Sequence, residues 1–238
     1  MIVGLIPALN EADRIGQVIA RARPFLDKMI VCDDGSSDDT GQVAQHFGAE
    51  VITHSRTRGY GAALRSMFLR ALQLRPIVAV TIDADGQHDP TSIPSLARPI
   101  LEGEADIVLG SRFLGRRSSI PAARLAGILL VTKFTELLTR CRITDSQCGL
   151  RCYSYSALKS VVPHDNGMGA SVEILFLAHR KRMRIVEGPT TVYYNGESDS
   201  SKDSLSHLIS LLQATLKSGI LGLDGSELFP FIAKSSDS

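Results

Sequence analysis

The chain has 238 residues, with 26 Lys and Arg side chains against 25 Asp and Glu, so its formal net charge is +1. A chain without a strong positive field has no electrostatic basis for holding a polyanion, and we expect no nucleic-acid partner. None of its four cysteines forms a C-x-x-C pair with nearby histidines, which favours reduced thiols over a zinc site or disulfide framework.

The first residues form an apolar run without a basic leader, which is typical of a buried strand and not of a signal peptide. No uncharged apolar run reaches the roughly 18 residues of a membrane span. Lys133, Glu136 and Lys217 interrupt the two best candidates. We therefore expect a cytoplasmic protein without a spanning helix, and attachment to the cytoplasmic face of a membrane stays open.

Short apolar runs alternate with amphipathic stretches through the first half of the chain. The runs with the composition of strands are residues 2–7, 29–32, 50–53, 77–82 and 106–109. Repeated strand–helix units predict an α/β fold with a single Rossmann-like, mostly parallel sheet flanked by helices. Ligands of such sheets bind beyond the carboxyl ends of the strands, so the loops after these runs carry the candidate chemistry.

The second half begins with a helix predicted over residues 122–138, which is apolar on most of its circumference. Such a helix is buried or has a hydrophobic partner. A further helix is expected over 169–182 and a strand over 184–194. Leu205, Leu208, Ile209, Leu212 and Leu216 then repeat at helical spacing. We expect one domain over 1–203, followed by an amphipathic helix and tail over 204–238.

An acidic loop, Asp-Ala-Asp-Gly-Gln-His-Asp-Pro, follows the fourth strand at residues 83–90. Asp83 and Asp85 can converge on one hard cation, because Mg²⁺ and Mn²⁺ favour oxygen ligands and keep sites for substrate phosphates. Two neighbouring acids without a cation would repel each other. Asp89 before Pro90 is typical of a helix N-cap. We predict a metal site at the first two acids and a structural role for the third.

The loop after the second strand, residues 33–40, is also acidic. Ser37 or Asp38 is expected to cap the next helix, and Asp39 suits the helix dipole. The carboxylate of Asp34, like that of its neighbour Asp33, can accept hydrogen bonds from a nucleobase or ribose.

Two further segments have competing interpretations. After the first strand, Asn10 as an N-cap and Glu11 in the first turn fit helix capping as well as ligand binding. The sequence R-G-Y-G-A-A at residues 58–63 follows a strand and opens a helix, like a dinucleotide fingerprint. We reject that interpretation, because Leu64 replaces the third glycine and the fingerprint normally follows the first strand.

Five segments in this order resemble family 2 glycosyltransferases, which have the GT-A fold, and particularly the polyprenyl- or dolichyl-phosphate sugar synthases. They are P-A-L-N-E at 7–11, D-D-G-S-S-D-D-T at 33–40, R-G-Y-G-A-A at 58–63, D-A-D-G-Q-H-D-P at 83–90 and G-S-R-F at 110–113. The resemblance implies a nucleotide-binding set of Pro7, Ala8, Asn10, Glu11, Asp34, Gly61, Asp83 and Ala84. It implies that Asp83, Asp85 and Gln87 hold Mg²⁺ or Mn²⁺.

The resemblance also implies the reaction, an inverting transfer of a sugar from a UDP- or GDP-linked donor. The cation and nearby basic groups would stabilise the departing diphosphate. The implied catalytic residues are Asp85, Arg112 and Glu173. A phosphate acceptor is already ionised, whereas a hydroxyl acceptor needs a base, for which Glu173 is the candidate. Capping a turn or pairing with an arginine is the alternative for Glu173.

A basic stretch precedes the apolar helix and predicts a polyprenyl phosphate acceptor, because guanidinium groups bind phosphate oxygens in paired hydrogen bonds. Its members are Arg112, Arg116, Arg117 and Arg124. We prefer Arg112 and Arg124 as phosphate contacts; pairing of these arginines with surface acids is the alternative. Residues 145–151 resemble the family's D-x-x-x-G-x-R stretch near the acceptor, which implies Ser146. Lys202 is the nearest cation where these synthases usually have an arginine.

Two other classes of protein compete with this interpretation. A sugar nucleotidyltransferase normally has a glycine-rich loop with a lysine after the first strand, and residues 7–11 have neither. A catalytically silent binding module would have no need of the set Asp83, Asp85 and Gln87. The nucleotide base and the sugar stay open.

Overall fold

The computed structural model describes residues 1–115, 120, 122–139 and 141–194. The expected helix and tail over 204–238, the division at residue 203, Lys202 and the pair Arg116 and Arg117 lie outside the described residues.

One seven-stranded sheet organises the described chain, in the order β3-β2-β1-β4-β6-β5-β7. The strands are β1 Ile2–Ala8, β2 Lys28–Asp33, β3 Glu50–Thr53, β4 Val78–Thr81, β5 Ile107–Ser111, β6 Arg151–Ser154 and β7 Ile185–Pro189. Only β6 runs antiparallel to its neighbours, β4 and β5, so the other strands send their carboxyl ends to one edge. The predicted α/β, mostly parallel fold is confirmed.

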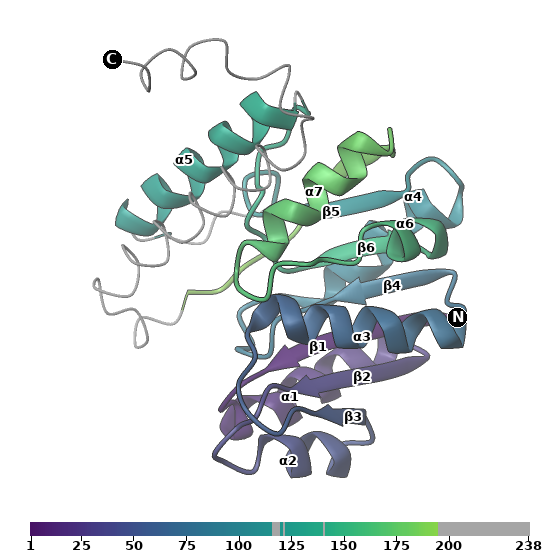
Figure 1. Ribbon diagram of the computed structural model, residues 1–238, viewed down its shortest axis with the longest axis vertical. Coiled ribbons are helices and arrows are strands. Elements are labelled where there is room, and N and C mark those ends of the chain that lie inside the picture. The colour runs from purple at the N-terminus through teal and green to yellow at the C-terminus, as the bar shows by residue number, and fades with distance from the viewer. Residues whose placement is uncertain (116–119, 121, 140, 195–238) are drawn as a thin grey trace, which may run out of the picture.

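Helices cover both faces of the sheet (Figure 1). The helices α1 Ala12–Ala22, α2 Thr40–His46 and α4 Ile93–Leu101 pack on one face, and α3 Tyr60–Leu74, α6 Tyr155–Ser160 and α7 Ala170–Arg180 on the other. Short 3₁₀ turns span Arg23–Phe25 and Pro90–Ser92. Because side chains alternate along a strand, Leu5 joins the core under α3 while Ile6 joins the core under α1. This two-sided burial explains the nearly continuous apolar strands.

The helix α5, Ala122–Thr139, lies at one end of the molecule beside α7 (Figure 1). Its inner side carries Val131 and a row of threonines, Thr132, Thr135 and Thr139, which are at most 3% exposed. Three of its leucines are exposed: Leu129 by 43%, Leu130 by 49% and Leu137 by 73%. The helix is therefore only partly buried. Among the described residues, no helix is long and apolar enough to cross a membrane.

The five strands expected in the first half of the chain are all present. The strand β6 was not predicted from the sequence, because four residues between a loop and the helix α6 leave little pattern to find. The strand expected over 184–194 is shorter and ends at Pro189. Beyond it the chain crosses the carboxyl edge of the sheet, where Val192 forms an antiparallel bridge with His88.

Candidate active site

The loops after β1 and β2 are joined by hydrogen bonds at the carboxyl edge of the sheet. The side-chain oxygen of Asn10 accepts from the N–H of Ser37 at 2.8 Å, and the hydroxyl of Thr40 accepts from the N–H of Glu11 at 2.8 Å. The N-cap of α2 is Asp39 and not Ser37 or Asp38, although the carboxylate of Asp38 accepts from the N–H of Thr40, the first residue of the helix, at 3.0 Å. The N-cap of α1 is Glu11 and not Asn10, which instead has a φ of 56°. Asn tolerates this left-handed conformation.

The other residues expected to bind the nucleotide lie at the same edge. Pro7 and Ala8 end β1, and Ala84 follows β4; all three are buried, so only their backbone can face a ligand. Their roles stay predictions.

Asp34 is only 4% exposed and uses both carboxylate oxygens inside the protein. Its Oδ1 lies 2.5 Å from Nδ1 of His54 and accepts from the N–H of Arg58 at 3.0 Å. Its Oδ2 accepts from the N–H of Gly59 at 2.7 Å. The carboxylate therefore ties the end of β2 to the segment that opens α3. A contact with a nucleoside stays a prediction and would use the remaining lone pairs.

Protein backbone occupies the N-terminus of α3. The N–H of Gly61 donates to the carbonyl of Asn166 at 2.9 Å, and a Cβ at this glycine would lie 2.1 Å from the carbonyl oxygen of Asp165. A phosphate cannot share that position, which agrees with rejecting a dinucleotide fingerprint. The crowding by the backbone of Asp165 explains by itself why this position is a glycine. Nucleotide binding by Gly61 stays a prediction.

Glu173 lies in the first turn of α7 and is 13% exposed. Its oxygens accept from the N–H groups of His164 at 2.9 Å and Asp165 at 2.8 Å, and from the imidazole of His164 at 3.0 Å. It therefore caps this loop, which is the alternative role expected for it. Its use as a general base stays a prediction.

The acidic loop after β4 is held by the segment that follows β7. Asp85 accepts from the N–H of Gln87 at 2.9 Å, and the Gln87 carbonyl accepts from the N–H of Tyr193 at 2.8 Å. Asp83 accepts from Nε2 of His88 at 3.0 Å. Asp89 caps the following 3₁₀ turn, as predicted.

The carboxylate of Asp83 lies against a glycine, Gly149, on the loop that leads into β6. A Cβ at Gly149 would lie 2.1 Å from Oδ2 of Asp83, so a larger residue there would require the carboxylate or the loop to move. The hydroxyl of Thr81 donates to the carbonyl of Gly149 at 2.8 Å and fixes the two loops together. Arg151 is 3% exposed and donates to the backbone carbonyls of Ser146, Cys148 and Ser171, at 2.8 Å to that of Cys148. The stretch over residues 145–151 is thus part of the acidic site.

The two acids have opposite pKa shifts. Burial opposes ionisation of Asp83, but the hydrogen bond from His88 and the charges of Arg151 and Arg112 hold its pKa below the ordinary value. Burial and the charge of Asp83 raise the pKa of Asp85, although Arg124 favours its ionised form. Asp83 and Asp85 therefore repel each other, and the charges of three arginines act on them.

These residues fit a hard divalent cation. The carboxylates lie two residues apart on one loop, and a cation between them would replace repulsion by attraction. Gln87 carries an amide oxygen on the same loop. Among the described residues, no group of three or more His, Cys, Asp or Glu side chains is arranged as a metal site. A bound diphosphate would have to supply further ligands, and the metal assignment stays a prediction.

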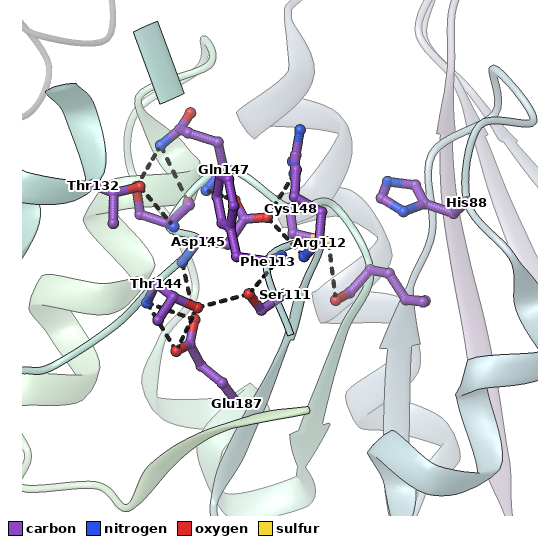
Figure 2. Close-up of polar contacts among 12 residues, drawn as sticks. His88, Ser111, Arg112, Phe113, Thr132, Thr144, Asp145, Gln147, Cys148 and Glu187 are labelled. Atoms are coloured by element: carbon purple, nitrogen blue, oxygen red, sulfur yellow. Dashed lines mark hydrogen bonds and ion pairs between the residues drawn. The ribbon is translucent and has the colours of Figure 1, made fainter. Parts of the chain in front are cut away.

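Arg112 lies beyond β5 in a buried ion pair (Figure 2). Its Nε donates to Oδ2 of Asp145 at 2.6 Å, with Arg112 8% exposed and Asp145 fully buried. Its Nη1 donates to the hydroxyl of Tyr194 at 2.6 Å. The guanidinium of Arg124 on α5 lies 5.1 Å from the centre of the same tyrosine ring. The structure thus brings Arg112 and Arg124 together through Tyr194, as the prediction of a shared phosphate site requires.

Ser146 lies inside the protein and not on the surface of the site. It has no exposed surface, and its hydroxyl lies 3.1 Å from that of Thr132 on α5. Nearby, Ser111 pairs with Thr144, whose N–H and hydroxyl are held by Glu187 (Figure 2). This network positions the loop that carries Asp145. Contact of Ser146 with an acceptor stays a prediction.

Four residues of this region were not predicted from the sequence: His54, His88, Gly149 and Tyr194. The signal for Gly149 was present, since a glycine inside the D-x-x-x-G-x-R stretch indicates a close approach. The others join only through contacts between residues far apart in the chain.

The fold and its edge define a class, the GT-A type of α/β sheet. Glucosyl-3-phosphoglycerate synthase from Mycobacterium tuberculosis, solved with Mn²⁺ and UDP, superposes with a TM-score of 0.71 at 24% identity, covering 92% of this chain and 79% of that one. At that identity the likeness shows the fold.

The sequence model described as Glycosyl transferase family 2 matches residues 5–161. The chain therefore belongs to family 2 of the glycosyltransferases and is a glycosyltransferase. It is 31% identical over 212 residues to UDP-N-acetylglucosamine–dolichyl-phosphate N-acetylglucosaminyltransferase of Methanococcus voltae, covering 80% of this chain and 84% of that one. It is 29% identical over 202 residues to undecaprenyl-phosphate mannosyltransferase of Micrococcus luteus, covering 80% and 82%.

Proposed function

We propose that this enzyme transfers a sugar from a UDP- or GDP-linked donor to a polyprenyl phosphate, with inversion at the anomeric carbon. The proposal rests on one observation: the same edge of the sheet holds two acids that repel each other and two arginines that contact the same tyrosine, Tyr194. Asp83 and Asp85 suit a cation with its diphosphate, while Arg112 and Arg124 suit a second phosphate. The names of the lipid-phosphate relatives support this acceptor.

A bound Mg²⁺ or Mn²⁺, held by Asp83, Asp85 and Gln87, would stabilise negative charge on the departing diphosphate. An oxygen of the acceptor phosphate attacks the anomeric carbon as the bond from that carbon to the diphosphate breaks. The electron pair of the broken bond leaves with the nucleoside diphosphate. The acceptor is already ionised, so no proton has to be removed. Arg112 and Arg124 orient the acceptor, and the fixed Asp145 keeps Arg112 in place.

A second candidate acceptor is a small phosphorylated molecule with a reacting hydroxyl. The structural likeness to glucosyl-3-phosphoglycerate synthase favours it. Such a hydroxyl needs a base, and Glu173 already accepts hydrogen bonds from the N–H groups of His164 and Asp165. Because Glu173 is already used in these hydrogen bonds, an acceptor that needs no base, a phosphate, is favoured.

A peripheral position at the cytoplasmic face of a membrane follows from the same proposal. Leu129, Leu130 and Leu137 are exposed on α5 beside Lys133, and Arg124 lies in the first turn of the same helix. A lipid with an anionic head would place its chain along the leucines and its phosphate near the arginine. We expect the full chain to float with vesicles that contain anionic lipid and polyprenyl phosphate. A wholly soluble protein in that flotation would rule out the membrane position.

Radiolabelled UDP- and GDP-sugars, offered with three acceptors, test the function. We expect transfer to a polyprenyl phosphate, and little to 3-phosphoglycerate or to a neutral glycan. Arg124→Ala should weaken use of the lipid acceptor much more than binding of the nucleotide. Transfer to a hydroxyl acceptor but never to a polyprenyl phosphate would refute the lipid acceptor and leave the glycosyltransferase intact.

A further inference from the structure

A buried polar chain links β2, β3 and α3 behind the donor end of the site. His54, the residue after β3, is 6% exposed. Its Nδ1 lies 2.5 Å from Oδ1 of Asp34, and its Nε2 lies 2.9 Å from the hydroxyl of Ser66 on α3. A carboxylate can only accept a hydrogen bond, so Nδ1 carries a proton and donates it. The two partners together fix the orientation of the imidazole ring.

This order of Asp34, His54 and Ser66 matches the connectivity of a hydrolytic triad, but its surroundings do not. Ser66 lies in the second turn of α3, where the N–H groups of the helix are used internally and none forms an oxyanion hole. Cys32, whose sulfur is 3.7 Å from Nε2 of His54, is also no nucleophile. Burial and the charges of Asp34 and Asp33 raise its pKa to about 12, so the thiol stays protonated. The network therefore orients its side chains and does not form a nucleophilic site.

The object that His54 positions is the carboxylate of Asp34. The same carboxylate holds the N–H groups of Arg58 and Gly59 at 3.0 and 2.7 Å. Gly59 has a φ of 102°, and a Cβ there would lie 2.3 Å from the carbonyl of Asn166. Asp34 therefore joins the end of β2 to the 56–59 loop, and that loop to the segment before α7. Without the donor from His54, the carboxylate loses one of these three hydrogen-bond partners and is held less firmly toward the loop.

We propose that His54 is a positioning residue of the donor site, which acts through Asp34 to hold the 56–59 loop in the shape that binds the nucleoside. This inference rests on the proposed function, since it needs a nucleotide-sugar donor. It assigns His54 to affinity for the donor and not to the chemical step. The role resides in one atom, the proton-bearing Nδ1, and a side chain that supplies a donor at that place can replace it.

Two amide variants separate this role from simple filling of space. Asn carries its amide near the position of Nδ1, whereas Gln carries it near that of Nε2. We expect His54→Asn to keep the affinity for UDP or GDP in the presence of Mn²⁺, and His54→Gln to weaken it about 10-fold, the cost of an unmade buried hydrogen bond. His54→Ala should raise KM for the donor with kcat nearly unchanged. His179→Ala, on the exposed side of α7, is the matched control and should change neither.

Isothermal titration with the nucleoside diphosphate and Mn²⁺, alongside thermal midpoints of each variant, gives the decisive numbers. If His54→Ala does not fold, the comparison of Asn with Gln still decides. Equal dissociation constants for wild type, Asn and Gln variants would overturn the positioning role, as would a loss confined to kcat. A wild-type protein that binds neither UDP nor GDP would overturn the proposed function itself, and with it this inference.

Discussion

The two halves of the sheet's carboxyl edge differ in how their charged side chains are paired. On the donor side, Asp83 and Asp85 are like charges on one loop, and burial together with the charge of Asp83 raises the pKa of Asp85. On the acceptor side, Arg112 and Asp145 are opposite charges 2.6 Å apart, and Asp145 is fully buried. We expect the first pair to need a cation between its acids, whereas the charges of the second pair already balance each other.

The difference teaches which acids serve the fold and which serve a ligand. A buried acid that is paired with a cationic side chain contributes to the folded state, and removing one partner leaves the other charge uncompensated. An acid that faces another acid costs free energy until a ligand arrives. The same Asp-to-Asn change should therefore have opposite effects on stability in the two halves.

The largest expected effect is that of Asp145→Asn. The change leaves the Arg112 guanidinium 8% exposed without its charged partner, and we expect the free energy of unfolding to fall by about 3–5 kcal/mol. Urea unfolding measures it. Asp106→Asn, which affects the more exposed pair with Arg184, is the control and should cause only a small change. Equal losses in both variants would mean that burial of the ion pair does not matter.

Asp85→Asn should abolish transfer, with a loss of about 10³-fold or more, because the departing diphosphate loses its cation. The thermal midpoint without ligand should stay level or rise. Because the folded-state pKa of Asp85 is raised, its contribution to stability is present at low pH and lost as pH rises through that pKa. The advantage of the variant should therefore be seen at pH 7 and vanish below about pH 4. If the variant were active, the assignment of Asp85 as a metal ligand would be wrong.

Gly149→Ala tests the seat of the donor-side carboxylate. The new Cβ would lie 2.1 Å from Oδ2 of Asp83, so the carboxylate or the loop must move. We expect Mn²⁺ affinity, measured by electron paramagnetic resonance with UDP or GDP present, to fall by about 10–100-fold. Gly167→Ala is the matched control, since its nearest neighbour would be 3.4 Å away. If the affinity of Gly149→Ala for Mn²⁺ were unchanged, Asp83 would not be a ligand of the cation.

The smallest expected effect is the coupling between metal and nucleotide. Mn²⁺ together with UDP or GDP should raise the wild-type thermal midpoint beyond the sum of the two separate shifts, because each completes the site of the other. A coupling of about 1–2 kcal/mol would add roughly 2–8 °C. Asp85→Asn should show no such excess. Purely additive shifts in the wild type would contradict a shared site.

The sequence predicted the donor half of the fold better than the acceptor half. Five apolar runs separated by amphipathic helices indicated the sheet, and Asp83 with Asp85 followed from their position after β4. Two features needed contacts that no pattern carries: the antiparallel β6, and the joining of Arg112 to Arg124 by Tyr194, 82 residues after Arg112. Asn10 was placed one residue out at the start of α1, because caps depend on local φ angles that composition does not fix.

The place of β6 has a consequence for how the protein is made. This strand lies between β4 and β5, yet it is translated after both. The carbonyl of Gly149, which accepts from the hydroxyl of Thr81, is translated 68 residues after that threonine. The same glycine lies against the carboxylate of Asp83 and is also translated long after it. A nascent chain that ends before residue 149 has an open sheet and an acidic loop without its neighbour, and such long-range pairing is slow. A ribosome-bound chain should therefore gain the capacity to hold a divalent cation only after β6 has emerged.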